Sequence, residues 1–268
     1  MESCARQKQR GFTLIELVVV ILVAGILAAL GGRLIVAPVT GYVDLTRRVR
    51  LVDQAELALS RMQRDLRQAL PNSIRIDASG RYLELLHTVD GGRYRRYLGA
   101  SGDDILDFTL ADNGFDVLGD LREVPAAGQN LVVYNTSSSG SSGNAYAAVP
   151  GNMAAVGSGS SVSHVSLSPA FQFSHASPYQ RFYTLDGPVT YACENGVLNR
   201  YAGYAIAASQ PLPPSVTPAL VTRNLGSCHF DYQPGSAQRA GLVSLALELS
   251  ESGETVRLWH QVHLVNAP

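Results

Sequence analysis

The chain has 268 residues, of which 16% are charged, and a formal net charge of −1. A nearly neutral chain without a strong basic excess does not favour nucleic acid, and we expect no nucleic-acid partner. The charged fraction is low against the usual ~25%, which suits an exported, loop-rich β protein. The length leaves room for one long helix and one domain of ordinary size.

A short polar leader opens the chain. Three basic residues in it, Arg6, Lys8 and Arg10, outnumber its single acid, Glu2. This excess predicts a cytoplasmic start and an exported remainder. Three further arginines at positions 47, 48 and 50 lie near the far end of the apolar run. They weaken the difference in charge between its two ends.

An apolar run follows the leader. From Phe12 to Gly32 the only non-apolar residues are Thr13 and Glu16, and the run has about the ~20 residues that an α-helix needs to cross a bilayer. A carboxylate in such a helix costs roughly 2.5–3.5 kcal/mol, so Glu16 is expected to be functional and to need a cationic partner.

Cleavage after Gly11 supplies that partner. Phe12 then becomes a new amino terminus four residues before Glu16. We expect its ammonium group and the carboxylate to neutralise each other between neighbouring subunits in an apolar bundle. A buried pair of this kind sets the register of the subunits more than it adds stability.

The segment Gly11-Phe12-Thr13-Leu14-Ile15-Glu16-Leu17 resembles the class III signal of type IV prepilins. The resemblance implies that a membrane prepilin peptidase cuts after Gly11 and N-methylates Phe12. It also implies that Glu16 pairs with a subunit's amino terminus during filament assembly. The implied partners are this peptidase, other pilin subunits and the inner-membrane assembly platform, with the chain held in the inner membrane before assembly.

Two other interpretations of the apolar run remain open. A secretory signal peptide has a shorter, uncharged apolar region and is cut behind it, and Ala28-Ala29 followed by Gly31-Gly32 mimics such a site. A plain membrane anchor is the second alternative, but it has no use for Glu16.

A second helical pattern follows the apolar run. Apolar residues recur at three- and four-residue spacing from Leu45 to Ala69, with charged residues between them, so this helix is expected to be amphipathic. Pro71 is expected to end it and Pro38 to bend its junction with the first helix. Together the two patterns predict one long helix from about Phe12 to Leu70.

Beyond the helix the hydrophobic period changes to two, which predicts short strands. The predicted strands are Tyr82–His87, Arg93–Leu98, Ile105–Leu110, Leu131–Tyr134, Val165–Phe173, Gln180–Leu185, Val189–Cys193, Val197–Tyr201, Ser227–Tyr232, Leu242–Leu249 and Val256–Val265. The fold class is therefore α+β: one long N-terminal helix packed on antiparallel sheet. The prepilin resemblance implies the lollipop shape of pilins.

Turn signals separate several of these strands. Asp90-Gly91-Gly92 is typical of a hairpin turn, and Asp186-Gly187-Pro188 and Asn195-Gly196 predict further turns. Ser252-Gly253-Glu254 is expected to join the last two strands. The Ser/Gly-rich stretch Asn135–Ser163 is predicted to be a flexible loop that contributes little to a core.

These patterns divide the chain into a leader (1–11), a transmembrane and assembly helix (12–41) and a periplasmic head (42–268). The head begins with the amphipathic helix (42–70) and continues as a β-rich part (72–268). Removal of the leader takes Cys4 with it and leaves Cys193 and Cys228. An even pair in an oxidising compartment predicts one disulfide, with two unpaired buried thiols as the alternative.

The sequence carries no catalytic signature, so we expect a protein that is not an enzyme and needs no cofactor. Asp112 and Asp116, at alternate positions around a glycine, are weak candidates for a calcium loop; a solvated turn is the alternative. His260 and His263 are three apart, which puts them on opposite faces of a strand and disfavours a shared metal.

Residues 181–189 and the closing residues 260–268 are similar to minor prepilins of the mannose-sensitive haemagglutinin (MSHA) pilus. The similarity implies a minor pilin that helps initiate or cap a type IV pilus. A minor pseudopilin of a type II secretion system and a tip adhesin module are the competing hypotheses.

Overall fold

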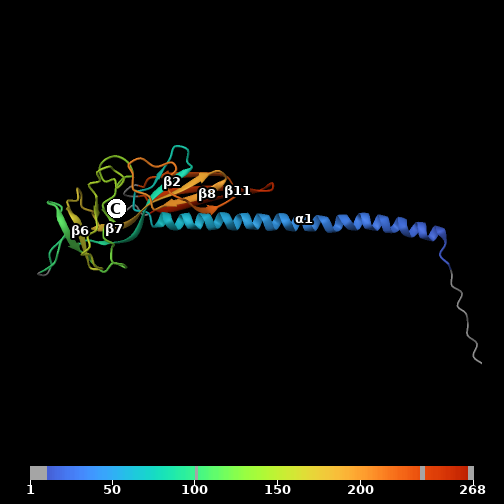
Figure 1. Ribbon diagram of the computed structural model, residues 1–268, viewed down its shortest axis with the longest axis horizontal. Helices are drawn as coiled ribbons and strands as arrows, with labels where there is room; N and C mark the ends of the chain where they lie inside the picture. Colours follow the sequence, from blue (N-terminus) through green and yellow to red (C-terminus); the bar gives the residue numbers. More distant parts are fainter. Residues whose placement is uncertain (1–10, 100–101, 236–238, 265–268) are drawn as a thin grey trace, which may run out of the picture. The chain divides into compact units, whose positions relative to one another are not determined.

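The structure, a computed structural model, describes residues 11–99, 102–235 and 239–264, without the side chains of residues 32–40. It contains one long helix, α1 (Leu14–Arg67), followed by antiparallel strands (Figure 1). The α+β class is therefore confirmed. The chain divides into two compact units, Met1–Arg50 and Leu51–Pro268, which we call the helix unit and the head unit.

In the helix unit, α1 begins at a clear N-terminal cap. Thr13 precedes the first helical residue, and its hydroxyl oxygen accepts a hydrogen bond from the Glu16 amide at 3.3 Å, as a threonine N-cap does. The window Leu14–Gly31 has a mean hydropathy of 2.8 and none of it is buried. The bend expected at Pro38 falls among side chains outside the described part and stays a prediction.

In the head unit, α1 presents an apolar stripe to the core. Leu51, Ala55 and Met62 are fully buried and pack in one cluster with residues of the sheets; Figure 1 shows this half of α1 alongside the strands. The expected stripe is thus buried only from Leu51 onward, since Leu45 and Val49 are 60% and 51% exposed.

The largest sheet is antiparallel and is built around one long ribbon of two strands, β2 (Tyr82–Arg93) and β7 (Arg181–Glu194). Its remaining strands are β1 (Arg75–Ile76), β4 (Asn130–Val133), β5 (Met153–Ala155), β8 (Val197–Ala202) and β9 (Ala219–Thr222). The order is β1-β2-β7-β4-β5, with β8 pairing with both β7 and β9.

Two smaller sheets complete the head unit. The first is β10 (Leu225–Gln233), β11 (Gly241–Glu251) and β12 (Glu254–Leu264), and the second is β3 (Asp112–Asp116) with β6 (His164–Phe171). The three-stranded sheet shares a core with α1 and the large sheet. A separate aromatic core lies around Phe115 and Phe182, whose rings meet edge to face with centroids 5.2 Å apart.

Two of the turn predictions are wrong. Asp90-Gly91-Gly92 lies inside β2 and Asp186-Gly187-Pro188 inside β7. Both segments belong to the β2–β7 ribbon. The pairing register of this ribbon shifts between His87 and Asp90, and these shifts accommodate residues that do not fit regular pairing. Backbone hydrogen bonds between distant strands therefore outweigh the local turn preference.

The turns at Asn195-Gly196 and Ser252-Gly253 are confirmed. Asn195 and Gly196 join β7 to β8, and Ser252 and Gly253 join β11 to β12. All four residues have positive φ, as a tight hairpin turn requires.

Two predicted strands are also wrong. Beyond Arg93, the segment Arg93–Leu98 contains only an isolated bridge at Tyr94, and Ile105–Leu110 has no strand. Apolar residues of both segments are nevertheless buried in the aromatic core, although their backbone is irregular: Tyr94 and Leu106 are 0% and 2% exposed.

The stretch from Asn135 to Ser163 contributes to a core, contrary to prediction. Tyr146 and Asn135 are 1% and 2% exposed, and the stretch contains strand β5. The Asn135 side chain organises it, because its amide donates to the Pro71 carbonyl at 2.8 Å and its oxygen accepts from the Ala145 amide at 2.9 Å. A hydrogen-bonded asparagine thus orders a segment whose composition is typical of flexible loops.

Candidate functional site

The predicted cleavage position lies just before α1. Gly11 and Phe12 are non-helical and exposed, Phe12 by 78%, and the helix begins two residues later at Leu14. Exposed, irregular backbone is the form of chain that peptidases cut most readily. Residues 1–10 of the predicted leader lie outside the described part.

Glu16 lies in the first turn of α1, where the helix dipole favours a negative charge. Its amide is satisfied by Thr13. Within the described residues its carboxylate makes no ion pair or hydrogen bond, while the neighbouring Ile15, Leu17 and Val18 are 67%, 56% and 48% exposed. An isolated carboxylate on an exposed apolar surface fits a site that is completed by another molecule.

The helix unit therefore offers a surface for association rather than for catalysis. Its exposed apolar face is continuous over the window Leu14–Gly31. Such a face needs lipid or other helices as partners.

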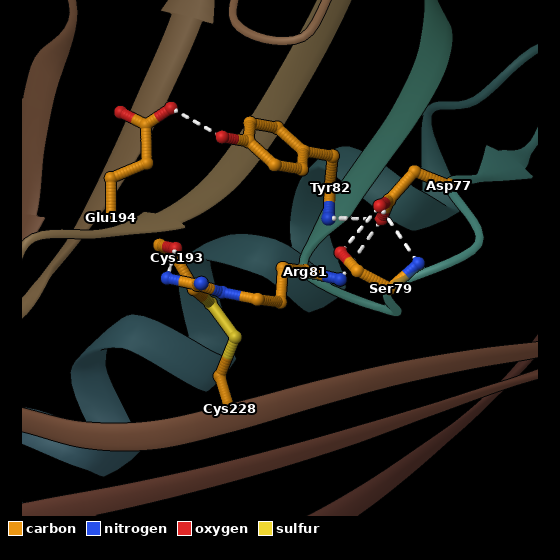
Figure 2. Close-up of a disulfide and its surroundings, with 7 residues drawn as sticks. All are labelled: Asp77, Ser79, Arg81, Tyr82, Cys193, Glu194 and Cys228. Atoms are coloured by element: carbon orange, nitrogen blue, oxygen red, sulfur yellow. Dashed lines mark hydrogen bonds between the residues drawn. A yellow bond between two sulfur atoms is a disulfide. The ribbon is translucent and has the colours of Figure 1, made fainter.

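A disulfide joins two sheets of the head unit. Cys193 of β7 and Cys228 of β10 are bonded, with Cα atoms 6.4 Å apart (Figure 2). The Cys193 amide donates to the Arg81 carbonyl at 3.1 Å, and the Arg81 guanidinium donates to the Cys193 carbonyl. The bond is thus embedded in a tight backbone contact between β7 and the start of β2.

Asp77 shapes the turn that carries Arg81 to the disulfide (Figure 2). Its carboxylate accepts hydrogen bonds from the amides of Ser79, Arg81 and Tyr82 at 2.9, 2.9 and 2.8 Å. Partial burial alone would raise the pKa of Asp77, but these bonds and that of the Ser79 hydroxyl lower it. This turn was not among those predicted, although Asp77-Ala78-Ser79-Gly80 is a recognisable signal for it.

Beside the disulfide, Glu194 accepts hydrogen bonds from the hydroxyls of Tyr82 and Tyr201 at 2.9 and 2.8 Å. Burial and this bonded carboxylate raise the pKa of Tyr201 to about 12. Both tyrosines therefore stay protonated and act as structural donors.

Two buried ionic networks that were not predicted from the sequence serve the same structural purpose. Asp65 of α1 accepts from the Tyr191 hydroxyl at 2.9 Å and the Arg200 guanidinium at 2.7 Å. Glu84, fully buried, accepts from Arg75 and, at 2.9 Å, from Tyr204. Burial raises the pKa of Glu84 against the opposing effect of Arg75. Spacing along the chain gives no signal for such long-range pairs.

The alternative interpretation of Asp112 and Asp116 as a solvated turn is wrong, because both lie in strand β3. Their carboxylates already accept protein donors: the Asp107 amide at 2.7 Å for Asp112, and the Asp104 amide at 2.9 Å for Asp116. Asp116 also lies 3.1 Å from the Nδ1 atom of His164. Among the described residues no group of three or more His, Cys, Asp or Glu is arranged to hold a metal ion.

His260 and His263 point to different sides of β12, as the spacing predicts. The Nε2 atom of His260 is buried, whereas His263 is exposed. The two imidazoles therefore do not form a common site.

Comparison with known proteins gives a match at the start of the chain. The family model described as the prokaryotic N-terminal methylation motif matches residues 6–32, which include Gly11, Phe12 and Glu16. No curated protein and no solved structure matches the chain. The motif is type IV prepilin-like and indicates a pilin or pseudopilin, processed by prepilin peptidase and assembled with other pilins; its family is structural rather than catalytic.

Proposed function

We propose that the chain is a minor pilin of an MSHA-type type IV pilus. Prepilin peptidase cuts it after Gly11 and N-methylates Phe12, and Glu16 then docks the subunit. The observation that carries the proposal is the methylation motif over residues 6–32, which coincides with the start of an apolar helix segment that is entirely exposed.

Docking follows from the chemistry of the new terminus. After cleavage the Phe12 ammonium lies four residues before Glu16, and the two charges of neighbouring subunits neutralise each other in the bundle. Leaving either charge unpaired among apolar helices costs several kcal/mol, so a subunit that is out of register is rejected. The apolar face of Leu14–Leu30 supplies the helix packing.

Before assembly the subunit spans the inner membrane once, with its head in the periplasm. The disulfide between Cys193 and Cys228 supports an oxidising compartment for the head. The basic leader supports a cytoplasmic start. The partners are the prepilin peptidase, companion pilins and the inner-membrane assembly platform.

Residues 181–189 and 260–268 resemble the MshO minor prepilin, and we infer a role of that kind. A minor subunit with a large head fits poorly along a packed shaft, so we place it at the tip, where it helps initiate or cap the filament. Electron microscopy of the tagged protein that found it along the whole shaft would contradict this position.

A minor pseudopilin of a type II secretion system shares the same motif and the same docking chemistry. Its partner would be an exported protein rather than a pilus. The genes that neighbour this one, pilus biogenesis or secretion, separate the two assignments.

The test is the intact mass of the protein from cells with and without prepilin peptidase. We expect a loss of residues 1–11 plus the gain of one methyl group, and no loss without the peptidase. A Gly11→Val variant is expected to stay uncut in both strains. An uncut wild-type chain, or a cut beyond Ala28, would overturn the proposal.

A further inference from the structure

A cavity of about 420 Å³ lies where the end of α1 meets the β2–β7 ribbon. Four arginines line it: Arg67 of α1, Arg93 of β2, Arg181 of β7 and Arg122 from the segment between β3 and β4. Among the described residues that line it, the one acid is Asp90. The cavity therefore concentrates positive charge on a chain that is nearly neutral as a whole.

Two of these arginines are forced together by the sheet. Arg93 and Arg181 are direct partners in the antiparallel register of β2 and β7. Side chains at such positions have Cβ atoms roughly 4.5–5.5 Å apart, and like charges there destabilise the sheet. The Arg181 guanidinium lies over the Tyr179 ring, 5.4 Å from its centroid, and an anion bound beside Arg93 would lower the repulsion between the two positive charges.

Asp90 brings a single negative charge against the four arginines. Its two carboxylate oxygens accept hydrogen bonds from the backbone amides of Gly91 and Arg122, at 2.8 and 2.7 Å. The Leu118 amide also donates to the Arg93 carbonyl at 2.7 Å. Asp90 thus fastens the segment that carries Arg122 to β2 and holds that arginine at the cavity.

Three of the four guanidinium groups are available to a ligand. Within the described part of the chain, the side chains of Arg67, Arg93 and Arg122 make no ion pair or hydrogen bond, and all three residues are exposed. They can therefore turn toward a ligand without breaking an existing contact.

The wall of the cavity beside Arg93 is closely packed. A Cβ atom at Gly91 would lie 2.9 Å from Cδ1 of Tyr183 and 3.0 Å from the Phe182 carbonyl oxygen. Only glycine therefore allows the β2 backbone to lie directly against the Tyr183 ring. Among the described lining residues this ring is the one aromatic side chain.

We propose that this arginine pocket binds an acidic saccharide through its carboxylate or sulfate groups. Guanidinium groups bind such oxyanions with paired hydrogen bonds. The volume matches a small-ligand site, and the single aromatic ring offers one face to a sugar. Single-stranded nucleic acid favours a longer groove with several stacking rings. The pocket goes beyond the assembly role and does not depend on it.

The test uses the full-length protein in a nonionic detergent and isothermal titration calorimetry. The probes are a heparin tetrasaccharide, a trigalacturonate, inorganic sulfate, neutral cellotriose and a single-stranded oligonucleotide. We expect saturable binding of both acidic saccharides that weakens with added salt, weaker binding of sulfate, and none of cellotriose.

The double variant R93Q/R122Q removes two guanidinium groups, and we expect it to bind the tetrasaccharide at least about tenfold more weakly. The matched control is R61Q/R223Q, which makes the same change of net charge at exposed arginines outside the pocket. It is expected to stay within about twofold of wild type, since distant surface charges are screened. If the double variant fails to fold, the single variant R122Q is tested in its place, because Arg122 lies on an exposed segment.

Three outcomes would overturn the proposal: equal weakening in the control variant, equal binding of cellotriose, or no binding of either acidic saccharide. Tighter binding of the oligonucleotide, lost in R93Q/R122Q, would reassign the pocket to nucleic acid. None of these results bears on cleavage after Gly11, so a failure here leaves the pilin proposal intact.

Discussion

The two halves of α1 differ in apolar content and in where their apolar side chains find burial: the first is apolar almost throughout, and the second is amphipathic. Leu17 in the helix unit is 56% exposed, whereas Leu66 in the head unit is 1% exposed. From Leu51 onward the apolar side chains pack against strands of the same chain, but over Leu14–Gly31 the structure buries none of the window. The first half therefore depends on other molecules for burial and the second half depends on the head.

This difference separates assembly from folding. Fully burying a leucine side chain stabilises by about 1.5–3 kcal/mol, and in the head that gain is already realised. In the helix unit the same gain becomes available only in a membrane or a bundle of subunits. Changes in the first half should alter association and leave the head's stability unchanged, and changes in the second half should do the reverse.

The largest effect is expected for Glu16→Leu. The substitution removes the docking charge, so the amount of subunit in sheared filaments should fall at least about tenfold, as measured by immunoblot. The thermal unfolding of the head should not change. Val18→Leu, an apolar exchange on the same helix, is the control. Normal incorporation of the Glu16→Leu variant into filaments would contradict the role in assembly that is given to the first half of α1.

In the second half, Leu66→Ala should lower the free energy of unfolding by about 2–5 kcal/mol, because it leaves a cavity in the core. Leu57→Ala is the matched control: Leu57 lies on the same helix but is 71% exposed, so its loss should cost under about 0.5 kcal/mol. Urea denaturation followed by circular dichroism measures both. Equal effects would mean that α1 does not pack on the head as described.

Removal of the disulfide acts on the head alone. Cys193 and Cys228 are 35 residues apart, and opening a loop of that size should cost about 3–4 kcal/mol by the chain-entropy model. The variant Cys193→Ala/Cys228→Ala should therefore unfold at lower urea concentration, and reduction of the wild type should reproduce the shift. Filament incorporation that fell while the head remained folded would point to a second role for this region.

The smallest effect is a dependence of the head's stability on pH. Hydrogen bonds lower the pKa of Asp77 in the folded protein, so its contribution is complete above the unfolded-state pKa and is lost as the pH falls through the folded-state pKa. The difference in urea midpoint between wild type and Asp77→Asn should therefore shrink from about pH 7 to about pH 3.

Asp53→Asn serves as the control for this pH series, since Asp53 is exposed on α1. We expect this exposed substitution to change the free energy of unfolding by less than about 0.5 kcal/mol. A wild-type advantage over Asp77→Asn that grew on acidification would contradict the role given to the Asp77 turn.

Features with local causes could be predicted from the amino-acid sequence. Apolar content and length predict the first helix, three- and four-residue spacing predicts the second, and Asn195-Gly196 and Ser252-Gly253 predict their hairpins. The α+β class follows from the change of period after Leu70. Each signal works because its cause acts over a few neighbouring residues.

Features that depend on distant partners are visible only in the folded chain. Asp90-Gly91-Gly92 would turn in isolation, but in the fold Gly91 pairs with Tyr183 and the turn becomes strand. Asn135 orders its loop through Pro71, 64 residues away. The arginine pocket exists because the register of two strands sets Arg93 opposite Arg181. Local preferences amount to about a kilocalorie per mole, and a paired ribbon with its packed side chains outweighs them.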